Sequence, residues 1–340
     1  MKTPPGIELA SEILVPSCFQ ITETEKPIPQ AGEVLIKVEG FGLNYADVMA
    51  RLGQYRDAPP LPAVLGYDVV GVIENVGPGV DEAKISQRVV AITRFGGYAE
   101  YAVAREEAVI EVPEDMPLAS AAALATQYAT AYYAAFQLGN VQEEERVFIH
   151  AAAGGVGLAL IQFCKLKNCV IYGTVSNDSK AEIIRALGVH HVINSNKQNV
   201  PEELKKLEHK FDVIFDSVGG KGVKIGLKAL RAGGRLVCYG GSQLTAGKGI
   251  FNLIKFGASF GLFSPIQLLT QSKSILGVAM LKLMTEHPRL LRAILGQVLN
   301  LLHEKKIGTP VGKSFTVDEL FQAHMHLQNR KSIGKIAVKW

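Results

Sequence analysis

Residues 146–176 constrain the fold more than any other stretch of this 340-residue chain. A short apolar run, 147–149, leads into small residues, and apolar residues then recur at helical spacing. Ala152, Gly154 and Gly157 occupy the three positions of the GxGxxG dinucleotide fingerprint. Such a turn brings backbone N–H groups to a pyrophosphate at the positive end of a helix. The stretch therefore predicts a nucleotide site in a turn whose residues are Ala152, Gly154, Gly155, Val156 and Gly157. The alternative is a tight strand-to-helix turn that binds nothing.

A second apolar strand, 170–175, follows at the distance expected of a βαβ unit. NAD-binding chains usually place an Asp or Glu at the end of this strand, where it binds the ribose 2′-hydroxyl. This chain has Ser176 there, with Lys180 four residues further on. A serine beside a cation suits a 2′-phosphate, so the pair favours NADP(H). Alternatively, Lys180 is a solvated helix residue and Asp178 binds the ribose.

Further strands alternate with helices after this unit, at 192–193, 211–215 and 236–239. This alternation predicts a parallel, doubly wound α/β sheet. Ligands bind such sheets beyond the carboxyl ends of their strands. We therefore expect Gly219, Tyr239 and Gly240 to lie beside the cofactor.

A β-rich amino-terminal region predicts a second domain. Val34, Ile36 and Val38 recur at every second position, as in a strand, and the composition changes to alanine-rich helix after Pro117. We place the boundary near Ala123, giving one domain of residues 1–123, completed by 284–340, and a nucleotide-binding domain of residues 124–283. Thr130 falls in the helical link, from which its side chain could face the space between the domains.

Composition excludes several functions. The net charge of +4 is spread thinly, so nothing indicates nucleic-acid binding. Four scattered cysteines suggest buried thiols in a reducing compartment. No signal-like amino terminus or convincing membrane span is present. We expect a cytoplasmic protein.

Asn44, Asp47 and Tyr55 are polar residues in apolar surroundings, and spacing alone favours a turn asparagine and a surface tyrosine. Residues 42–55, however, resemble the pattern GxNxxDxxxRxGxY of the zinc-free quinone oxidoreductase (zeta-crystallin-like) branch of the medium-chain dehydrogenase/reductase superfamily. Residues 152–165 fit the nucleotide signature of that branch. The resemblance runs the whole length. It implies a GroES-like β-rich catalytic domain beside a Rossmann domain, with Asn44 and Tyr55 lining the nicotinamide pocket and Thr130 holding the carboxamide.

The resemblance also bears on metal binding. Catalytic zinc in this superfamily needs three Cys, His or carboxylate ligands. The matching positions here are Asn44, Tyr67 with Asp68, and Thr126. Because an amide, a phenol and a hydroxyl are poor zinc ligands, we predict no metal.

Without metal, hydride from the nicotinamide must reach an acceptor that needs little Lewis-acid help. Quinones and α,β-unsaturated carbonyls (enals and enones) fit, because conjugation spreads the developing charge onto an oxygen that hydrogen-bond donors can stabilise. The acceptor's proton would come from water or Tyr55.

Segments 239–245, 254–269 and 332–335 look similar to the VAT-1 group of the branch. This similarity leaves open an alternative function, a nucleotide-binding protein with a lipid- or membrane-associated, largely non-catalytic role. The apolar stretch 250–284 would then contact a membrane, although a buried substrate wall and a dimer surface are the expectation we favour. A strand at 275–280 would pair across a two-fold axis, so we expect a homodimer.

Overall fold

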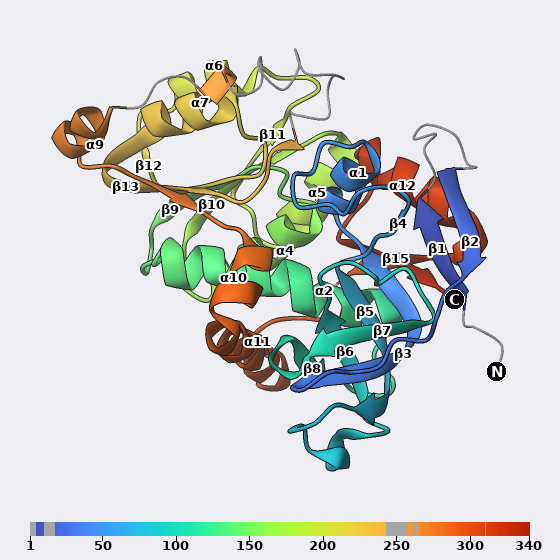
Figure 1. Cartoon of the computed structure of the whole chain (residues 1–340). Coiled ribbons are helices and arrows are strands. Elements are labelled where there is room, and N and C mark those ends of the chain that lie inside the picture. The colour runs from blue at the N-terminus through green and yellow to red at the C-terminus, as the bar shows by residue number, and fades with distance from the viewer. Residues whose placement is uncertain (1–4, 10–17, 243–257, 261–263, 310) are drawn as a thin grey trace. The chain divides into compact units, whose positions relative to one another are not determined.

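The computed structural model describes residues 5–9, 18–242, 258–260, 264–309 and 311–340, with residues 5–9 as backbone only (Figure 1). The chain divides into two compact units. Unit 1 comprises Met1–Ala129, Met280–Lys305 and Thr309–Trp340, and unit 2 comprises Thr130–Ala279 and Lys306–Gly308. The domain limits expected from the sequence, at residues 123 and 283, stay predictions.

Unit 1 is built on a mostly antiparallel sheet. Within the described residues its strand order is β15 (Gly312–Thr316), β16 (Lys335–Lys339), β3 (Glu33–Leu43), β5 (Asp68–Val76), β6 (Arg88–Ile92) and β8 (Val109–Glu111), with β7 (Tyr101–Arg105) also paired to β3. A smaller sheet joins β2 (Phe19–Glu23), β1 (Pro5–Leu9) and β4 (Ala63–Val64). The alternating residues Val34, Ile36 and Val38 are buried in the core of this unit. Their alternation therefore marks the inward face of β3, as the period of a strand requires.

Helices cover unit 1. They are α1 (Tyr45–Arg51), α2 (Leu118–Ala123), α10 (Met280–Glu286), α11 (Pro288–His303) and α12 (Leu320–Gln328), with a π-helical segment at Leu124–Tyr128. Apolar residues recur at helical spacing from about Pro288 to His303, which predicts a helix over this range, and α11 has these bounds. Its buried face carries Leu291, Ile294, Leu295 and Val298, which recur at three- and four-residue intervals.

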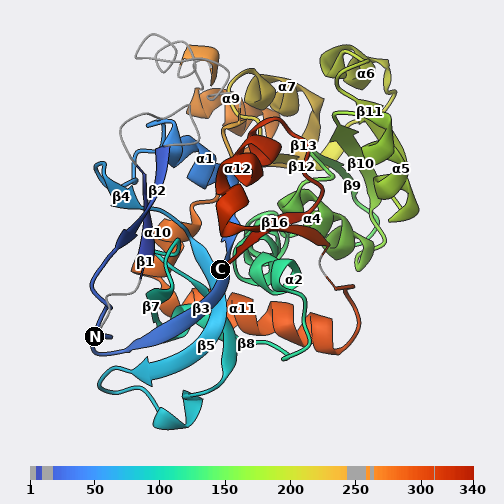
Figure 2. The same ribbon diagram turned by 90° about the vertical axis from the view of Figure 1, so that its right-hand side faces the viewer.

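Unit 2 contains the predicted parallel, doubly wound sheet. Its described strands follow the order β11 (His191–Asn194), β10 (Val170–Val175), β9 (Arg146–Ile149), β12 (Phe211–Asp216), β13 (Leu230–Cys238) and β14 (Ser274–Gly277). The helices are α4 (Gly155–Lys165), α5 (Asp178–Ala186), α6 (Val200–Lys206), α7 (Lys221–Ala229) and α9 (Pro265–Gln271), after a helical segment that begins with α3 (Ala129–Tyr132). Figures 1 and 2 show α7 and α4 on opposite faces of this sheet. The fold class expected from the sequence is confirmed.

The strand expected at 275–280 is shorter in the structure. Strand β14 ends at Gly277, and α10 begins at Met280. Within the described residues β14 is the last strand of its sheet, beside β13. Parts of the segments 239–245 and 254–269 that the sequence singled out, namely residues 243–245, 254–257 and 261–263, lie outside the described residues.

Candidate active site

The glycine turn of unit 2 has the geometry that its sequence predicts. Gly154 is the N-cap of α4, and Gly155, Val156 and Gly157 form its first turn, where backbone N–H groups lack intrahelical partners. A Cβ on Gly157 would lie 2.6 Å from the carbonyl oxygen of Ala151 and 2.7 Å from the Cα of Ala152. Glycine at 157 therefore allows the close approach of helix to strand that this kind of nucleotide site needs.

Neighbouring strands bring further predicted residues to the same edge of the sheet. The backbone N–H of Gly219 donates to the buried carboxylate of Asp216 (3.1 Å), at the end of β12. Tyr239 follows β13, and its N–H donates to the carbonyl oxygen of Asp216 (2.9 Å). A Cβ on Gly240 would lie 2.8 Å from the carbonyl oxygen of Ser217. Gly219, Tyr239 and Gly240 thus gather at the carboxyl ends of β12 and β13, where doubly wound sheets bind ligands.

His150 joins this edge and was not predicted from the sequence. It follows β9, is buried, and its carbonyl oxygen accepts the Tyr239 hydroxyl (3.4 Å). Burial lowers the pKa of His150 below its ordinary value, although the charge of Asp216 opposes the shift. A neutral imidazole therefore lies next to the glycine turn at neutral pH.

The expected determinants of cofactor preference follow β10. Ser176 is half-buried directly after the strand, and Lys180 is buried in the first turn of α5. Asp178, the alternative ribose ligand, accepts from Lys197 Nζ (2.5 Å) and Asn194 Nδ2 (2.8 Å). Both contacts lower the pKa of Asp178, and the hydrogen bond from Lys197 has the largest effect. The carboxylate is thus already engaged within the protein.

The link residue Thr130 lies in α3 and is buried. Its role toward the nicotinamide carboxamide stays a prediction.

Unit 1 contains a buried polar network centred on Asp68. Asp68 Oδ2 accepts from Lys335 Nζ (2.7 Å), Asn44 Nδ2 (2.7 Å) and Thr126 Oγ1 (2.5 Å). Lys335 Nζ also donates to Asn44 Oδ1 (2.9 Å). Lys335 and Asp68 are both fully buried, with 0% relative exposure. Three parts of the chain therefore meet around one carboxylate oxygen: the residue after β3, the middle of the π-helical segment Leu124–Tyr128, and the start of β16.

Asp47 supports Asn44 from the first turn of α1. Its Oδ2 accepts the backbone N–H of Asn44 (2.7 Å). Burial is the main cause that raises the pKa of Asp47 to about 8, and the charge of Asp68 also contributes to the rise. The hydrogen bond from the Asn44 N–H and the charge of Lys335 oppose this shift. At neutral pH this carboxyl is therefore mainly protonated.

Tyr55 is half-buried and packs edge-on against Tyr67, with ring centroids 5.8 Å apart. Burial raises the pKa of Tyr55 above its ordinary value, and the Tyr67 hydroxyl lowers it in part. Tyr55 would therefore act as a neutral hydroxyl. Among the described contacts none joins Tyr55 to Asn44 directly.

The positions that resemblance matches to zinc ligands are thus brought together, but around an ammonium ion. Asp68 Oδ2 already accepts three hydrogen bonds, and Asn44 and Thr126 contribute an amide and a hydroxyl. A zinc ion would have to displace Lys335 and would find no thiolate or imidazole in this network. These residues do not fit a catalytic zinc.

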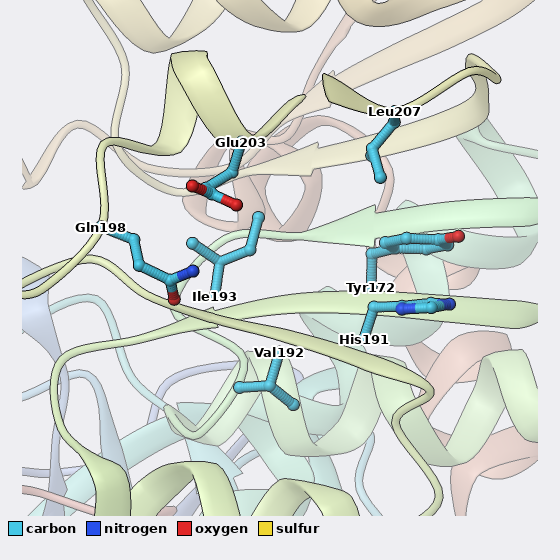
Figure 3. Close-up of a pocket in the computed structure, with 7 residues that line it drawn as sticks. All are labelled: Tyr172, His191, Val192, Ile193, Gln198, Glu203 and Leu207. Atoms are coloured by element: carbon cyan, nitrogen blue, oxygen red, sulfur yellow. The ribbon is translucent and has the colours of Figure 1, made fainter. Parts of the chain in front are cut away.

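A pocket of about 170 Å³ lies in unit 2 beside β11, whose residues His191, Val192 and Ile193 line it. Figure 3 shows Tyr172 and His191 side by side in it, and their rings stack at 4.3 Å. Gln198, Glu203 and Leu207 line the same pocket. None of the residues predicted from the sequence as site residues lines this pocket.

Lys335 belongs to the buried network and was not predicted as a site residue; its segment, 332–335, was singled out only by family resemblance. Its only local signal is a lysine that opens an otherwise apolar strand, Ile336, Ala337 and Val338. That signal is weak, because the first residue of a strand is often exposed.

Two family models match the chain. "Alcohol dehydrogenase GroES-like domain" covers residues 30–114 and "Zinc-binding dehydrogenase" covers residues 155–295. The synaptic vesicle membrane protein VAT-1 homolog of Danio rerio is 33% identical over 315 residues, which are 92% of this chain and 65% of that relative. The quinone oxidoreductase of Rattus norvegicus is 33% identical over 240 residues, 70% of each chain.

Solved structures agree in fold. Mycobacterial Rv1454c complexed with NADPH superposes with a TM-score of 0.85 at 26% identity, covering 99% of this chain and 100% of that one. The CurK enoyl reductase gives 0.84 at 26% identity, with 99% of both chains covered.

The fold is therefore that of a two-domain dehydrogenase, with a GroES-like domain and a Rossmann domain. The chain belongs to the medium-chain dehydrogenase/reductase superfamily, in its zeta-crystallin and VAT-1-like group. Over the described residues, no helix combines the length and apolar character needed to cross a membrane.

Proposed function

We propose that this protein is an NADPH-dependent, zinc-independent reductase that transfers hydride to quinones or α,β-unsaturated carbonyls. The observation that carries the proposal is the amide of Asn44, which the buried network of unit 1 holds in place although Asn44 itself is only half-buried. The names of the relatives, a quinone oxidoreductase and an enoyl reductase, support the acceptor class.

The cofactor would bind in unit 2. The first turn of α4 would bind the pyrophosphate through its free N–H groups, and Ser176 with Lys180 would bind the 2′-phosphate. Gly219, Tyr239 and Gly240 would border the dinucleotide, and Thr130 would hold the carboxamide. Bound NADPH would supply the hydride. The protein contributes position and electrostatics.

The acceptor would bind to residues of unit 1. Asn44 would donate an N–H to the carbonyl oxygen on which negative charge develops, and one preorganised donor of this kind contributes about 3 kcal/mol to stabilising the transition state. Tyr55, whose pKa is raised, would keep its proton until the reduced acceptor needs it.

Substitution of Asn44 by alanine tests the proposal. We expect turnover of a quinone to fall about 100-fold, since one donor to the developing oxyanion is lost. NADPH affinity, measured by fluorescence titration, should stay within twofold, because in this proposal unit 2 would bind the nucleotide. A large loss of NADPH binding would contradict the role assigned to Asn44.

A second candidate function is a lipid- or membrane-associated role. Helix α9 carries Ile266 and Leu269, which are 69% and 79% exposed, and relatives carry the name synaptic vesicle membrane protein. Flotation with phosphatidylcholine–phosphatidylserine vesicles, comparing wild type with Ile266→Ser/Leu269→Ser, tests it. Flotation of the wild type alone would favour this function, and absence of flotation in both would reject it. A homodimer through β14 remains our expectation for the assembly.

A further inference from the structure

The side-chain amide of Asn44 is held at both ends. Its Oδ1 accepts from Lys335 Nζ (2.9 Å) and its Nδ2 donates to Asp68 Oδ2 (2.7 Å). Lys335 and Asp68 in turn bond to each other (2.7 Å), which closes a triangle. Because Lys335 can only donate and an ionised Asp68 can only accept, the amide has one permitted orientation.

One hydrogen of Asn44 Nδ2 remains outside this triangle. A primary amide carries two N–H donors, and among the described residues no bond from Nδ2 other than that to Asp68 is recorded. Asn44 is only half-buried, unlike Lys335 and Asp68. The second N–H is therefore the group that an incoming ligand oxygen could reach.

The chain makes room for the Lys335–Asp68 pair at Gly42. A Cβ at position 42 would lie 1.8 Å from Asp68 Oδ1 and 2.6 Å from Lys335 Nζ. Gly42 pairs with Ala337 across β3 and β16, so it lies beside the middle of β16, two residues from Lys335. A buried lysine also costs much desolvation energy unless it is paired. Both observations indicate that this position of the ammonium group is built into the fold.

We propose that Lys335 is a positioning residue which, with Asp68, holds the Asn44 amide so that one N–H faces the acceptor oxygen. This inference rests on the proposed function, in which Asn44 contacts the acceptor. Without Lys335 the amide could turn over and present Oδ1, which would repel an oxyanion. The ammonium on Oδ1 also polarises the amide and strengthens its N–H donors.

The experiment is a mutant cycle on quinone reduction. Lys335→Met/Asp68→Asn removes both charges together, which avoids an unpaired buried charge. We expect this variant to lose about 100-fold in kcat, as Asn44→Ala does, with a smaller change in KM. Adding Asn44→Ala to the double variant should lower kcat by less than a further threefold, because the amide is already misplaced. Lys339→Met, at the exposed end of the same strand, is the matched control and should keep wild-type turnover.

Two kinetic results would overturn the inference. One is full turnover by Lys335→Met/Asp68→Asn. The other is a triple variant, with Asn44→Ala added, whose loss of kcat equals the product of the two separate losses. Independent effects on kcat multiply in this way.

A second measurement separates this inference from failure of the proposed function. In protein labelled with ¹⁵N-asparagine, the side-chain signals of Asn44, assigned by their loss in Asn44→Ala, report the amide directly. We expect them to shift in Lys335→Met/Asp68→Asn and to stay in place in Lys339→Met. If the wild type reduces no acceptor, the proposed function fails, and these signals still decide whether Lys335 fixes the amide. Unchanged Asn44 signals in the double variant would overturn it.

Discussion

Lys335 Nζ lies 2.7 Å from Asp68 Oδ2, and both side chains are fully buried. Lys335 begins β16 and Asp68 begins β5, so the ion pair joins strands that are distant in sequence. Strand β3 lies between them in the sheet and leads into Asn44. The pair therefore links the fold of unit 1 to the position of its candidate catalytic amide.

Replacing Lys335 alone should destabilise the protein strongly. Lys335→Met leaves the carboxylate of Asp68 buried and unpaired, which typically costs about 3–5 kcal/mol. We expect this loss in the free energy of unfolding measured with urea, whereas Lys335→Met/Asp68→Asn should lose much less. Equal losses in the two variants would show that the charge of Asp68 is not what the lysine neutralises.

Gly42→Ala should disturb the same pair by steric overlap. The new methyl group would meet Asp68 Oδ1 and Lys335 Cε at 1.8 and 2.3 Å. We expect a loss of at least about 1–3 kcal/mol in unfolding free energy, together with lower turnover. Gly296→Ala in α11 is the control, since a Cβ there meets nothing within 4 Å and alanine favours helix. If Gly42→Ala leaves both the unfolding free energy and turnover unchanged, the tight packing of this pair is refuted.

Asp47 should make stability depend on pH. Its pKa is raised from 3.8 to about 8 in the folded state, so between those values the native state holds a proton that the unfolded state has released. Stability from this group is complete below pH 3.8 and is lost as pH rises through about 8. We expect wild type to lose stability relative to Asp47→Asn across this window, measured as Tm at successive pH values. Parallel curves for the two proteins would contradict the raised pKa.

Ser176→Asp should reverse cofactor preference. A carboxylate at the end of β10 would repel a 2′-phosphate and could bind a ribose hydroxyl. We expect at least a tenfold loss of NADPH affinity, about 1.4 kcal/mol, with NADH affinity equal or better. Ser274→Asp, exposed at the start of β14, adds the same charge elsewhere and should change neither affinity. Unchanged NADPH binding in Ser176→Asp would show that the phosphate binds elsewhere.

Local sequence patterns predicted the elements of the fold well. Strand Val170–Val175 and helix Pro288–His303 have the expected bounds, because an apolar run and an amphipathic stripe are signals within one element. The π-helical segment Leu124–Tyr128 and the hairpin of β1 with β2 were not predicted. Helix type within an alanine-rich stretch and pairing of short strands depend on tertiary contacts, which periodicity does not contain.

The residues of the candidate site also differ in whether a local sequence pattern could predict them. The turn from Ala152 to Gly157 could be found, because its residues are consecutive and Gly157 has a steric reason to lack a side chain. The role of Lys335 could not, because it depends on contacts with Asp68 and Asn44, which lie 267 and 291 positions away. From spacing alone Asn44 looked like an ordinary turn residue, and only the family resemblance singled it out.

The most direct test of the account is to titrate the purified protein with NADPH and NADH and then to measure turnover of an ortho-quinone and a simple enone. We predict tighter binding of NADPH and acceptor-dependent NADPH oxidation that falls about 100-fold in Asn44→Ala. Tight NADPH binding without turnover of either acceptor would contradict the reductase function and favour a non-catalytic role. Preference for NADH would contradict the assignment of Ser176 and Lys180 to the 2′-phosphate.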